Sequence, residues 1–365
     1  MAERILINCR EDELTRERAG FYSALRRRVD VLVAPVRRVD ASVIELAGGA
    51  SIPVSHVSSL WHLDPPTTTI PEGLPATTLL TVWVHMDGAT AIPWRSLWSQ
   101  LFDVACVCGT EGSGFDGAGI YRVVAQPYAA RREWFSSEMT KRDLDLAWAG
   151  STRGSIYSRR RWILPRMAAR YRMNDWREQI PEAAVLPLYR RAKIVVNIQR
   201  DDCPELYNLR CFEAFAAGAL VLIETPTALE GAGFREGIHY AGYRSETDLF
   251  EKIDFFLANE GGRTAIAAAG RDLVQRRHTY DHRVAELLSI LGEVQKTKSR
   301  YRQPLSRARG NYLYCHYYSK RLDVHALSAH LKPLFHSASP LTVPAIAHCS
   351  RALWHRWWNA RAASI

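Results

Sequence analysis

Acidic, basic and amide side chains recur at short spacings in the segment ELYNLRCFEAFAAGALVLIE, which begins at Glu205. Asn208 is a good helix N-cap, and Gly218 suits the residue that ends a short helix. Arg210 and Glu213 lie three residues apart near the start of that helix. An arginine beside a helix N-terminus suits a diphosphate, and a carboxylate can accept two hydrogen bonds from a ribose diol. The spacing therefore favours a nucleotide site, and a solvated i,i+3 ion pair is the alternative.

A glycine-led turn in the middle of the chain is a second candidate for phosphate binding. Gly150 and Ser151 open this turn directly after a predicted strand, and Arg153 lies two residues further on. Glycine lets the backbone approach a phosphate, and the hydroxyl adds a donor. Arg160 is the middle one of three arginines that begin the predicted helix beyond the turn. We expect all four residues to contact a diphosphate, while a solvated basic face is the alternative for any single arginine.

The N-terminal half offers His85 and Asp87, which come at the end of an apolar strand-like run at residues 79–84. As alternate residues they point to the same side, so both are expected to face a cleft opposite the turn and helix described above. A structural role is the alternative for a lone histidine at a strand end. A glycine-rich loop at residues 111–114 follows the next strand and is a candidate for acceptor binding.

Short apolar runs alternate with helix-length stretches along most of the chain, which predicts an α/β fold with mainly parallel sheets. Ligands bind beyond the carboxyl ends of such strands, so a functional residue should follow a strand. The expected strands are 5–9, 31–35, 79–84, 104–108, 122–125, one from about 144, 194–198 and 219–224. The expected helices are 11–28, 157–171, one from about 208, 248–257, 264–275 and 281–291.

The bulk composition is that of a globular chain with two domains. With 365 residues, of which 47% are hydrophobic and 24% charged, the chain is long enough for two cores. We assign residues 1–140 and 141–295 to the two domains and residues 296–365 to an extension. No apolar run suits a membrane helix or a secretory signal, and the odd, scattered cysteines favour free thiols. These features predict a cytoplasmic location.

The extension from residue 296 carries twelve Lys and Arg residues against one acid, Asp323, whereas the whole chain has a net charge of +10. Aromatic residues alternate with these cations and with histidines. One interpretation is an anionic membrane surface, with tryptophan at the interface and arginine outward. The second is nucleic acid, bound by stacking and phosphate contacts. The third is packing back onto the N-terminal domain.

The segment that begins at Asn208, a GFREGIHYAGY stretch and an HTYDHR motif together resemble the C-terminal domain of spore-maturation-type (CgeB-like) glycosyltransferases. The resemblance covers about residues 144–291, and these proteins belong to the retaining enzymes of the GT-B fold, two Rossmann-like domains facing a cleft. Glu205 and Glu213 have the Glu-x7-Glu spacing of many such enzymes. The resemblance implies that Glu213 binds the ribose hydroxyls and that Glu205 lies near the donor sugar. It also implies that His85 or Asp87 contacts the donor sugar or the acceptor.

The predicted function is transfer of a sugar from a nucleoside diphosphate sugar, such as a UDP- or GDP-sugar, to an acceptor hydroxyl with retention. The acceptor is unassigned: a glycan, a lipid-linked glycan, a protein or a small molecule. No HExxH or EF-hand motif occurs, nor an Asp-x-Asp motif of the kind that metal-dependent GT-A enzymes use, so neither metal nor cofactor is expected. The alternatives are a GT-B-shaped nucleotide-sugar epimerase and a protein that binds nucleic acid or a membrane through its basic extension. A peripheral location at the inner face of the membrane would agree with the membrane alternative.

Overall fold

The N-terminal half is built on a parallel sheet in the order β2-β1-β6-β7-β8-β9. The structure, a computed structural model, describes residues 4–64, 68–85, 96–108, 122–135, 140–202, 207–301 and 305–362. Both β6 and β7 are buried along their whole length, which indicates that both faces of the sheet are covered. The strands are β1 (Arg4–Asn8), β2 (Asp30–Val33), β6 (Ser59–Leu63), β7 (Leu80–His85), β8 (Val104–Val107) and β9 (Arg122–Ala125).

A small antiparallel sheet is inserted between β2 and β6. It has the order β3-β4-β5, and its strands are β3 (Val36–Val39), β4 (Val43–Leu46) and β5 (Ser51–Pro53). Its apolar side chains join the core on one face of the large sheet. The strand-to-helix alternation therefore breaks at this point, which the sequence pattern did not predict.

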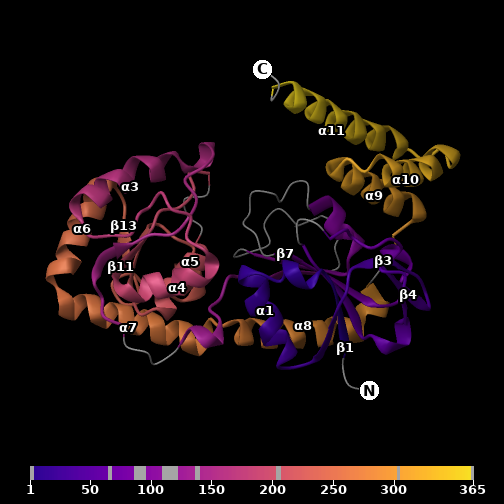
Figure 1. Cartoon of the computed structure of the whole chain (residues 1–365). Coiled ribbons are helices and arrows are strands. Elements are labelled where there is room, and N and C mark those ends of the chain that lie inside the picture. Colours follow the sequence, from indigo (N-terminus) through magenta and orange to yellow (C-terminus); the bar gives the residue numbers. More distant parts are fainter. Residues whose placement is uncertain are drawn as a thin grey trace.

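The C-terminal half, at the left of Figure 1, is built on a second parallel sheet in the order β10-β11-β12-β13. Its side chains alternate between two cores. One core contains residues of α4, α5 and α7, and the other contains residues of α3 and α6. The elements are β10 (Leu144–Ala147), α3 (Ser158–Arg170), α4 (Glu182–Arg191), β11 (Ala192–Asn197), α5 (Leu209–Ala216), β12 (Leu220–Glu224), β13 (Ala241–Tyr243), α6 (Glu246–Ala258) and α7 (Glu260–Arg277).

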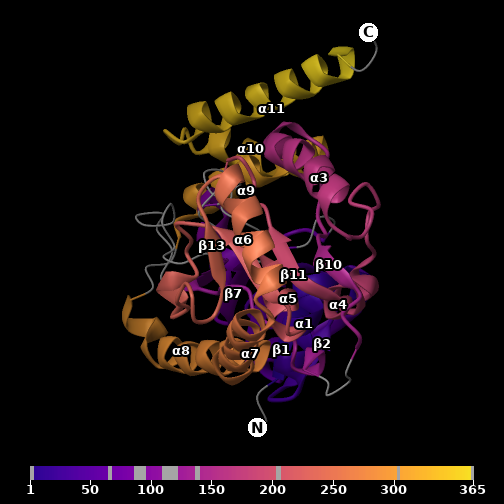
Figure 2. The ribbon, with the colours of Figure 1, turned by 90° about the vertical axis from the view of Figure 1, so that its left-hand side faces the viewer.

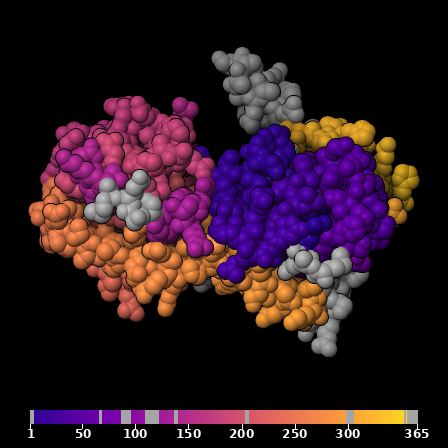
Figure 3. Space-filling view, turned by 60° about the horizontal axis from the view of Figure 1, so that its bottom comes forward, coloured from indigo at the N-terminus to yellow at the C-terminus, as the bar shows by residue number. Residues whose placement is uncertain are grey.

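The chain crosses back from the second half to the first at the end of α7. There the backbone nitrogen of Ala130 donates to the oxygen of His278 at 2.8 Å, and that of Tyr280 donates to Ala130 at 3.0 Å. The next helix, α8 (Tyr280–Tyr301), runs beneath the N-terminal half, and the orange segment spans the underside of both halves in Figure 3. Its apolar face joins a core with β1 and with α1 (Arg16–Arg26). The predicted boundary at residue 295 therefore does not follow the packing, because α8 is buried against the first domain.

The basic extension forms α9 (Arg307–Arg321), α10 (Val324–His336) and α11 (Thr342–Ala362) on the other side of the N-terminal sheet, with α11 at the top of Figures 1 and 2. The aromatic side chains of α9 are buried in the same core as Leu6 and Trp83. Tyr314 donates a hydrogen bond to the oxygen of Pro71, and Tyr317 accepts one from the nitrogen of Ile70 at 3.0 Å. The third interpretation of the extension, packing onto the N-terminal domain, is confirmed for α9. The described helices include no stretch whose length and hydropathy suit a membrane span.

Candidate functional site

The carboxyl ends of β10, β11 and β12 lie at one edge of the C-terminal sheet, because all their pairings are parallel. The segments that follow these strands carry the candidate residues. Gly150 and Ser151 come shortly after β10, Asn208 precedes α5 in the connection after β11, and Glu224 ends β12. The candidate residues Gly150, Ser151 and Asn208 therefore all lie in segments that follow strands of this sheet.

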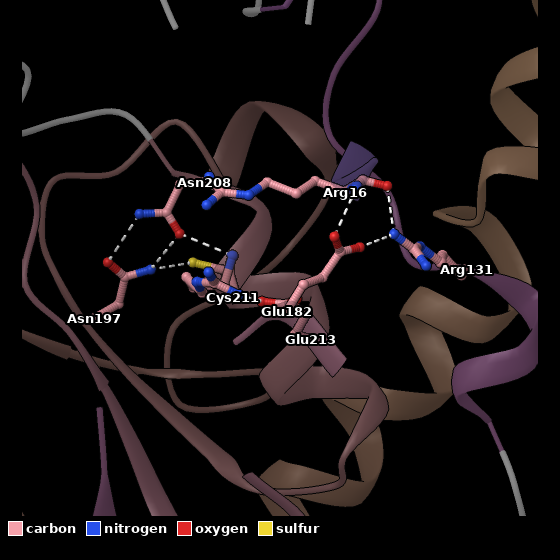
Figure 4. Close-up of polar contacts among 8 residues, drawn as sticks. Arg16, Arg131, Glu182, Asn197, Asn208, Cys211 and Glu213 are labelled. Carbon is pink, nitrogen blue, oxygen red and sulfur yellow. Dashed lines mark hydrogen bonds and ion pairs between the residues drawn. The ribbon is translucent and has the colours of Figure 1, made fainter. Parts of the chain in front are cut away.

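The start of α5 is held by amide side chains. Asn208 is the N-cap, and its Oδ1 atom accepts from the backbone nitrogen of Arg210 at 3.0 Å. Asn197, at the end of β11, donates to the same oxygen at 3.2 Å and to the Sγ atom of Cys211 at 2.7 Å (Figure 4). At the other end Gly218 has a φ of 68°, a backbone conformation that glycine adopts without strain. Both predicted helix boundaries are confirmed, and the cap fixes the direction of α5 relative to β11.

Arg210 and Glu213 form an ion pair one turn into α5. The Nη1 atom of Arg210 lies 2.6 Å from the Oε2 atom of Glu213, and the side chains are 22% and 3% exposed. Burial raises the pKa of Glu213, and the charge of Arg210 opposes this effect. The alternative of a solvated surface pair is therefore excluded for Glu213. A buried carboxylate needs partners, and a ribose diol offers two hydrogen-bond donors.

The N-terminal half contacts the C-terminal half beside this ion pair. Glu182, the first residue of α4, accepts from the backbone nitrogen of Arg16 at 3.0 Å and also binds the guanidinium of Arg131 (Figure 4). Arg131 in turn donates to the backbone oxygen of Arg16, whose φ is 51°. The charges of Arg131 and Glu182 act in opposite directions on the pKa of Glu213. The sequence analysis did not find this contact, because its members lie 51 to 166 residues apart.

The turn after β10 is held in place by an arginine of α3. The Arg160 guanidinium donates to the oxygen of Ile198 and to that of Ser151, both at 2.9 Å, and lies over the ring of Tyr157. A Cβ atom on Gly150 would lie 3.4 Å from the Arg160 Nη1 atom and 2.9 Å from the ring of Trp148. Arg160 is 6% exposed. It therefore ties the turn to the end of β11, and its direct contact with a diphosphate stays a prediction.

The remaining residue of the predicted turn, Arg153, lies on the surface. Its backbone nitrogen donates a hydrogen bond to the Oγ atom of Ser151 at 3.2 Å. This hydrogen bond places Ser151 and Arg153 next to each other in the turn, and their contact with a phosphate stays a prediction.

In the N-terminal sheet His85 ends β7 and is 2% exposed. Its Nδ1 atom lies 3.0 Å from the Oδ2 atom of Asp64, the residue after the neighbouring strand β6. Its ring stacks on Trp83 with centroids 5.2 Å apart. Because an ionised carboxylate only accepts hydrogen bonds, Asp64 favours the tautomer with the proton on Nδ1. The sequence analysis missed Asp64, since it did not predict β6.

Three candidates from the sequence lie outside the described residues: Asp87, Glu205 and the loop at residues 111–114. In the sequence, Asp87 comes two residues after His85, and Glu205 comes two residues before Tyr207.

Together, the two parallel sheets, the crossing helix α8 and the capped helix α5 define an α/β chain of the GT-B fold. Residues 131–289 match a protein family described as glycosyl transferase-like. This segment contains the C-terminal sheet, the ion pair of α5 and the turn after β10. A sequence comparison with curated proteins finds no match.

Several solved structures share this fold. HepE from Anabaena, in complex with UDP and glucose, has a TM-score of 0.54 at 10% identity, over 80% of this chain and 100% of HepE. Sucrose-phosphate synthase from Thermosynechococcus elongatus has a TM-score of 0.50 at 12% identity, over 81% and 100% of the two chains. The UDP-forming α,α-trehalose-phosphate synthase from Burkholderia vietnamiensis has a TM-score of 0.50 at 9% identity, over 82% of this chain and 99% of the synthase. At this level of identity the likeness establishes the fold alone.

Proposed function

We propose that the protein transfers a sugar from a nucleoside diphosphate sugar to an acceptor hydroxyl. The observation that carries the proposal is the buried carboxylate of Glu213, paired with Arg210 at the N-terminus of α5. It lies inside the glycosyl transferase-like segment, at the sheet edge where α/β proteins bind ligands. HepE, which shares the fold, binds UDP and glucose.

In this proposal the donor lies across the C-terminal half. Glu213 accepts hydrogen bonds from the ribose hydroxyls, and Glu205 serves the donor sugar. Arg210, the N-terminus of α5 and the Gly150–Ser151 turn bind the diphosphate, and Asn208 fixes the start of that helix. Arg153 adds charge beside the turn, and Arg160 holds the turn in position. The acceptor enters from the N-terminal half, where His85 and Asp87 are the candidates for contact with the donor sugar or the acceptor.

The chemical step exchanges one C–O bond for another. The bond between the anomeric carbon and the diphosphate oxygen breaks, and its electron pair leaves with the diphosphate. The acceptor oxygen bonds to the anomeric carbon. With retention the acceptor arrives on the face that the diphosphate leaves, so the departing phosphate oxygen is the nearest base for its proton. Arginine side chains and a helix N-terminus can offset the departing charge without a metal.

Nucleotide binding tests this proposal most directly. The full chain is screened by thermal shift against UDP-, GDP-, ADP-, CMP- and dTDP-sugars, with Glu213→Ala and the control Glu260→Ala, whose native side chain is 81% exposed on α7. One class of donor should raise the Tm of the wild type and of Glu260→Ala but not of Glu213→Ala. If no donor stabilises the wild type, the proposal fails. The anomeric configuration of the product, measured by NMR, tests retention.

We propose in addition that α10 and α11 bring the enzyme to an anionic membrane surface. Apolar side chains stay exposed on both helices, with Val324 63%, Phe335 55%, Val343 73% and Trp354 63% exposed. Val324 and Phe335 border an apolar groove of about 190 Å³ that also includes Lys332. Residues 324–365 contain no Asp or Glu, so the segment complements negative lipid headgroups.

Vesicle co-sedimentation tests this second proposal. The protein should pellet with vesicles of phosphatidylglycerol and phosphatidylcholine and stay in solution with phosphatidylcholine alone. Phe335→Ser should weaken binding, whereas Phe255→Ser, which removes a 57% exposed phenylalanine from α6, should not. Binding of duplex DNA or RNA instead of anionic vesicles would support the nucleic-acid alternative.

A further inference from the structure

A buried arginine at the start of α8 forms no ion pair with a carboxylate of the described residues. Arg283 is 9% exposed, and its Nη2 atom donates to the Nδ1 atom of His278 at 2.7 Å. Among the residues that the structure describes, nothing hydrogen-bonds to its buried Nε atom. Burial lowers the pKa of Arg283, yet an arginine keeps its charge in proteins. Among the described residues, Arg283 hydrogen-bonds to the neutral ring of His278, and the carboxylate of Glu286 on the same helix acts on its charge only at longer range.

Other buried arginines of this chain have carbonyl or carboxylate partners. The Arg160 guanidinium binds two backbone oxygens at 2.9 Å. Arg263, which is 5% exposed, donates to the oxygen of Phe256 at 2.6 Å and lies 3.6 Å from Glu260. Buried charges are normally compensated in this way. The contrast indicates that the partner of Arg283 is a ligand.

Two neighbours of Arg283, His278 and Tyr207, carry hydrogen-bond donors that no described residue accepts. Because the Nη2 atom can only donate, Nδ1 of His278 accepts, and the neutral ring carries its proton on Nε2. Burial lowers the pKa of His278 to about 3, so the ring is neutral in solution near pH 7. Tyr207 is 8% exposed and lies within electrostatic reach of Arg283. No described residue forms a hydrogen bond with its buried hydroxyl. A cation and two neutral donors without an acceptor match an anion.

The cluster lies where the two halves meet. Tyr207 stands in the connection before α5, two residues after Glu205, and is also within electrostatic reach of Cys108, the residue after β8. His278 takes part in the backbone crossing with Ala130. A ligand that bridges the two halves would therefore reach Arg283.

We propose that Arg283 and Tyr207 form an anion subsite of the cleft, which binds a phosphate or carboxylate group of a substrate. The subsite rests on the proposed function and adds to it a specific requirement for a negatively charged group where the two halves meet. The anion has two sources, the diphosphate of the donor or an acidic group on the acceptor. Both present oxygen acceptors to the same guanidinium, so one set of variants tests both.

The first experiment measures stability and anion binding of the full chain. Arg283→Gln removes an uncompensated charge and should leave the Tm without ligand unchanged or higher, whereas the control Arg263→Gln loses carbonyl contacts and should lower it. The Tm increase that pyrophosphate causes should be lost in Arg283→Gln and kept in Arg263→Gln. Tyr207→Phe should weaken pyrophosphate binding about threefold to tenfold. A lower Tm of Arg283→Gln with unchanged pyrophosphate binding would show a structural role and overturn the subsite.

Calorimetry then identifies the source of the anion. If the donor supplies it, Arg283→Gln should bind UDP at least about tenfold more weakly and uridine equally well. If the acceptor supplies it, UDP binding should stay the same while binding of inorganic phosphate is lost. Equal binding of every anion by wild type and Arg283→Gln would overturn the proposal. Failure of the proposed function would give a different result. No nucleotide sugar would then bind the wild type, while pyrophosphate would still raise the Tm of the wild type and not that of Arg283→Gln.

Discussion

The Nδ1 atom of His85 lies 3.0 Å from the Oδ2 atom of Asp64, so a carboxylate after β6 fixes an imidazole at the end of β7. The backbone supports this contact, since the nitrogen of Asp64 donates to the oxygen of Val84 at 2.9 Å. A histidine that is oriented by a carboxylate has one defined tautomer, with Nε2 as the acceptor nitrogen. Under the proposed function, a ring fixed in this tautomer would always offer an acceptor to a sugar hydroxyl, whereas a ring that exchanges between tautomers would offer it only part of the time.

We expect Asp64→Asn to lower kcat for sugar transfer by about 10- to 100-fold, because the asparagine can present an NH₂ group to Nδ1 and select the other tautomer. The KM for the donor should change little, since the proposed nucleotide site is on the other half. Steady-state kinetics over pH 6–9 measures both effects. Asp30→Asn, which removes an exposed ion pair with Arg4, is the control. An unchanged kcat for Asp64→Asn would remove His85 from the proposed machinery.

The role assigned to Glu213 predicts a specific interaction with the ribose. The 2′-deoxy form of the preferred nucleotide should bind the wild type about 10- to 150-fold more weakly, since a hydrogen bond to a charged group contributes roughly 1.5–3 kcal/mol. Glu213→Ala should bind both forms with equal affinity. Calorimetry measures the affinity of both nucleotides for both proteins, which separates the contribution of the 2′-hydroxyl from that of Glu213. If the deoxy nucleotide loses the same affinity in both proteins, the 2′-hydroxyl is bound elsewhere.

Arg160 should act on the donor through the turn that it holds. Arg160→Met leaves the oxygens of Ile198 and Ser151 without their donor, which should lower the free energy of unfolding by about 1–3 kcal/mol per buried group left unpaired. Donor affinity should fall with it, because the Ser151 turn loses its attachment to β11. Arg161→Met, whose exposed side chain binds the oxygens of Thr152 and Gly154, is the comparison. Denaturant unfolding and calorimetry separate the two effects, and weaker donor binding in Arg161→Met alone would contradict the assignment.

The parts of the fold that the sequence predicted are those with long apolar runs or strong caps. β7, β8 and β12 were expected within one or two residues, and α5 was expected from its cap. β6 was missed because it contains polar side chains that are buried and paired: Trp61 donates to the Oγ atom of Ser59 at 2.8 Å, and His62 contacts Asn8. Such pairing depends on residues far away in the chain, which a periodicity does not record.

The extension shows the same limit. The tyrosines of α9 are interleaved with cations in the extension, a pattern typical of a surface, but the hydroxyl groups of Tyr314 and Tyr317 bind the backbone of residues 70–74 across about 240 positions of sequence. In the candidate site, Arg210 and Glu213 were predicted because they share one helix. Asp64 and Glu182 were not, because their partners lie on other elements.

A last prediction concerns the pH dependence of stability. Burial lowers the pKa of His62 to about 4, and Asn8 reinforces the neutral form by donating to Nδ1 at 2.8 Å. The direction of that contact is settled, because Oδ1 of Asn8 accepts from the nitrogen of Val36 at 2.7 Å. The folded pKa lies below the unfolded value of about 6.5, so below pH 6.5 the unfolded chain binds a proton that the folded protein does not. The stabilising effect is complete above pH 6.5 and is lost progressively as the pH falls toward 4.

The expected slope for His62 is about 1.4 kcal/mol of unfolding free energy per pH unit between pH 6 and 4.5. His62→Gln should be less stable at pH 8 and should show a shallower dependence than the wild type across this range. His56→Gln, which changes an exposed histidine before β6, should keep the slope of the wild type. Urea unfolding at several pH values measures the three slopes. Parallel slopes for wild type and His62→Gln would mean that His62 does not resist protonation. The acid sensitivity would then come from other groups, such as the buried histidines His278 and His316, whose pKa values burial also lowers.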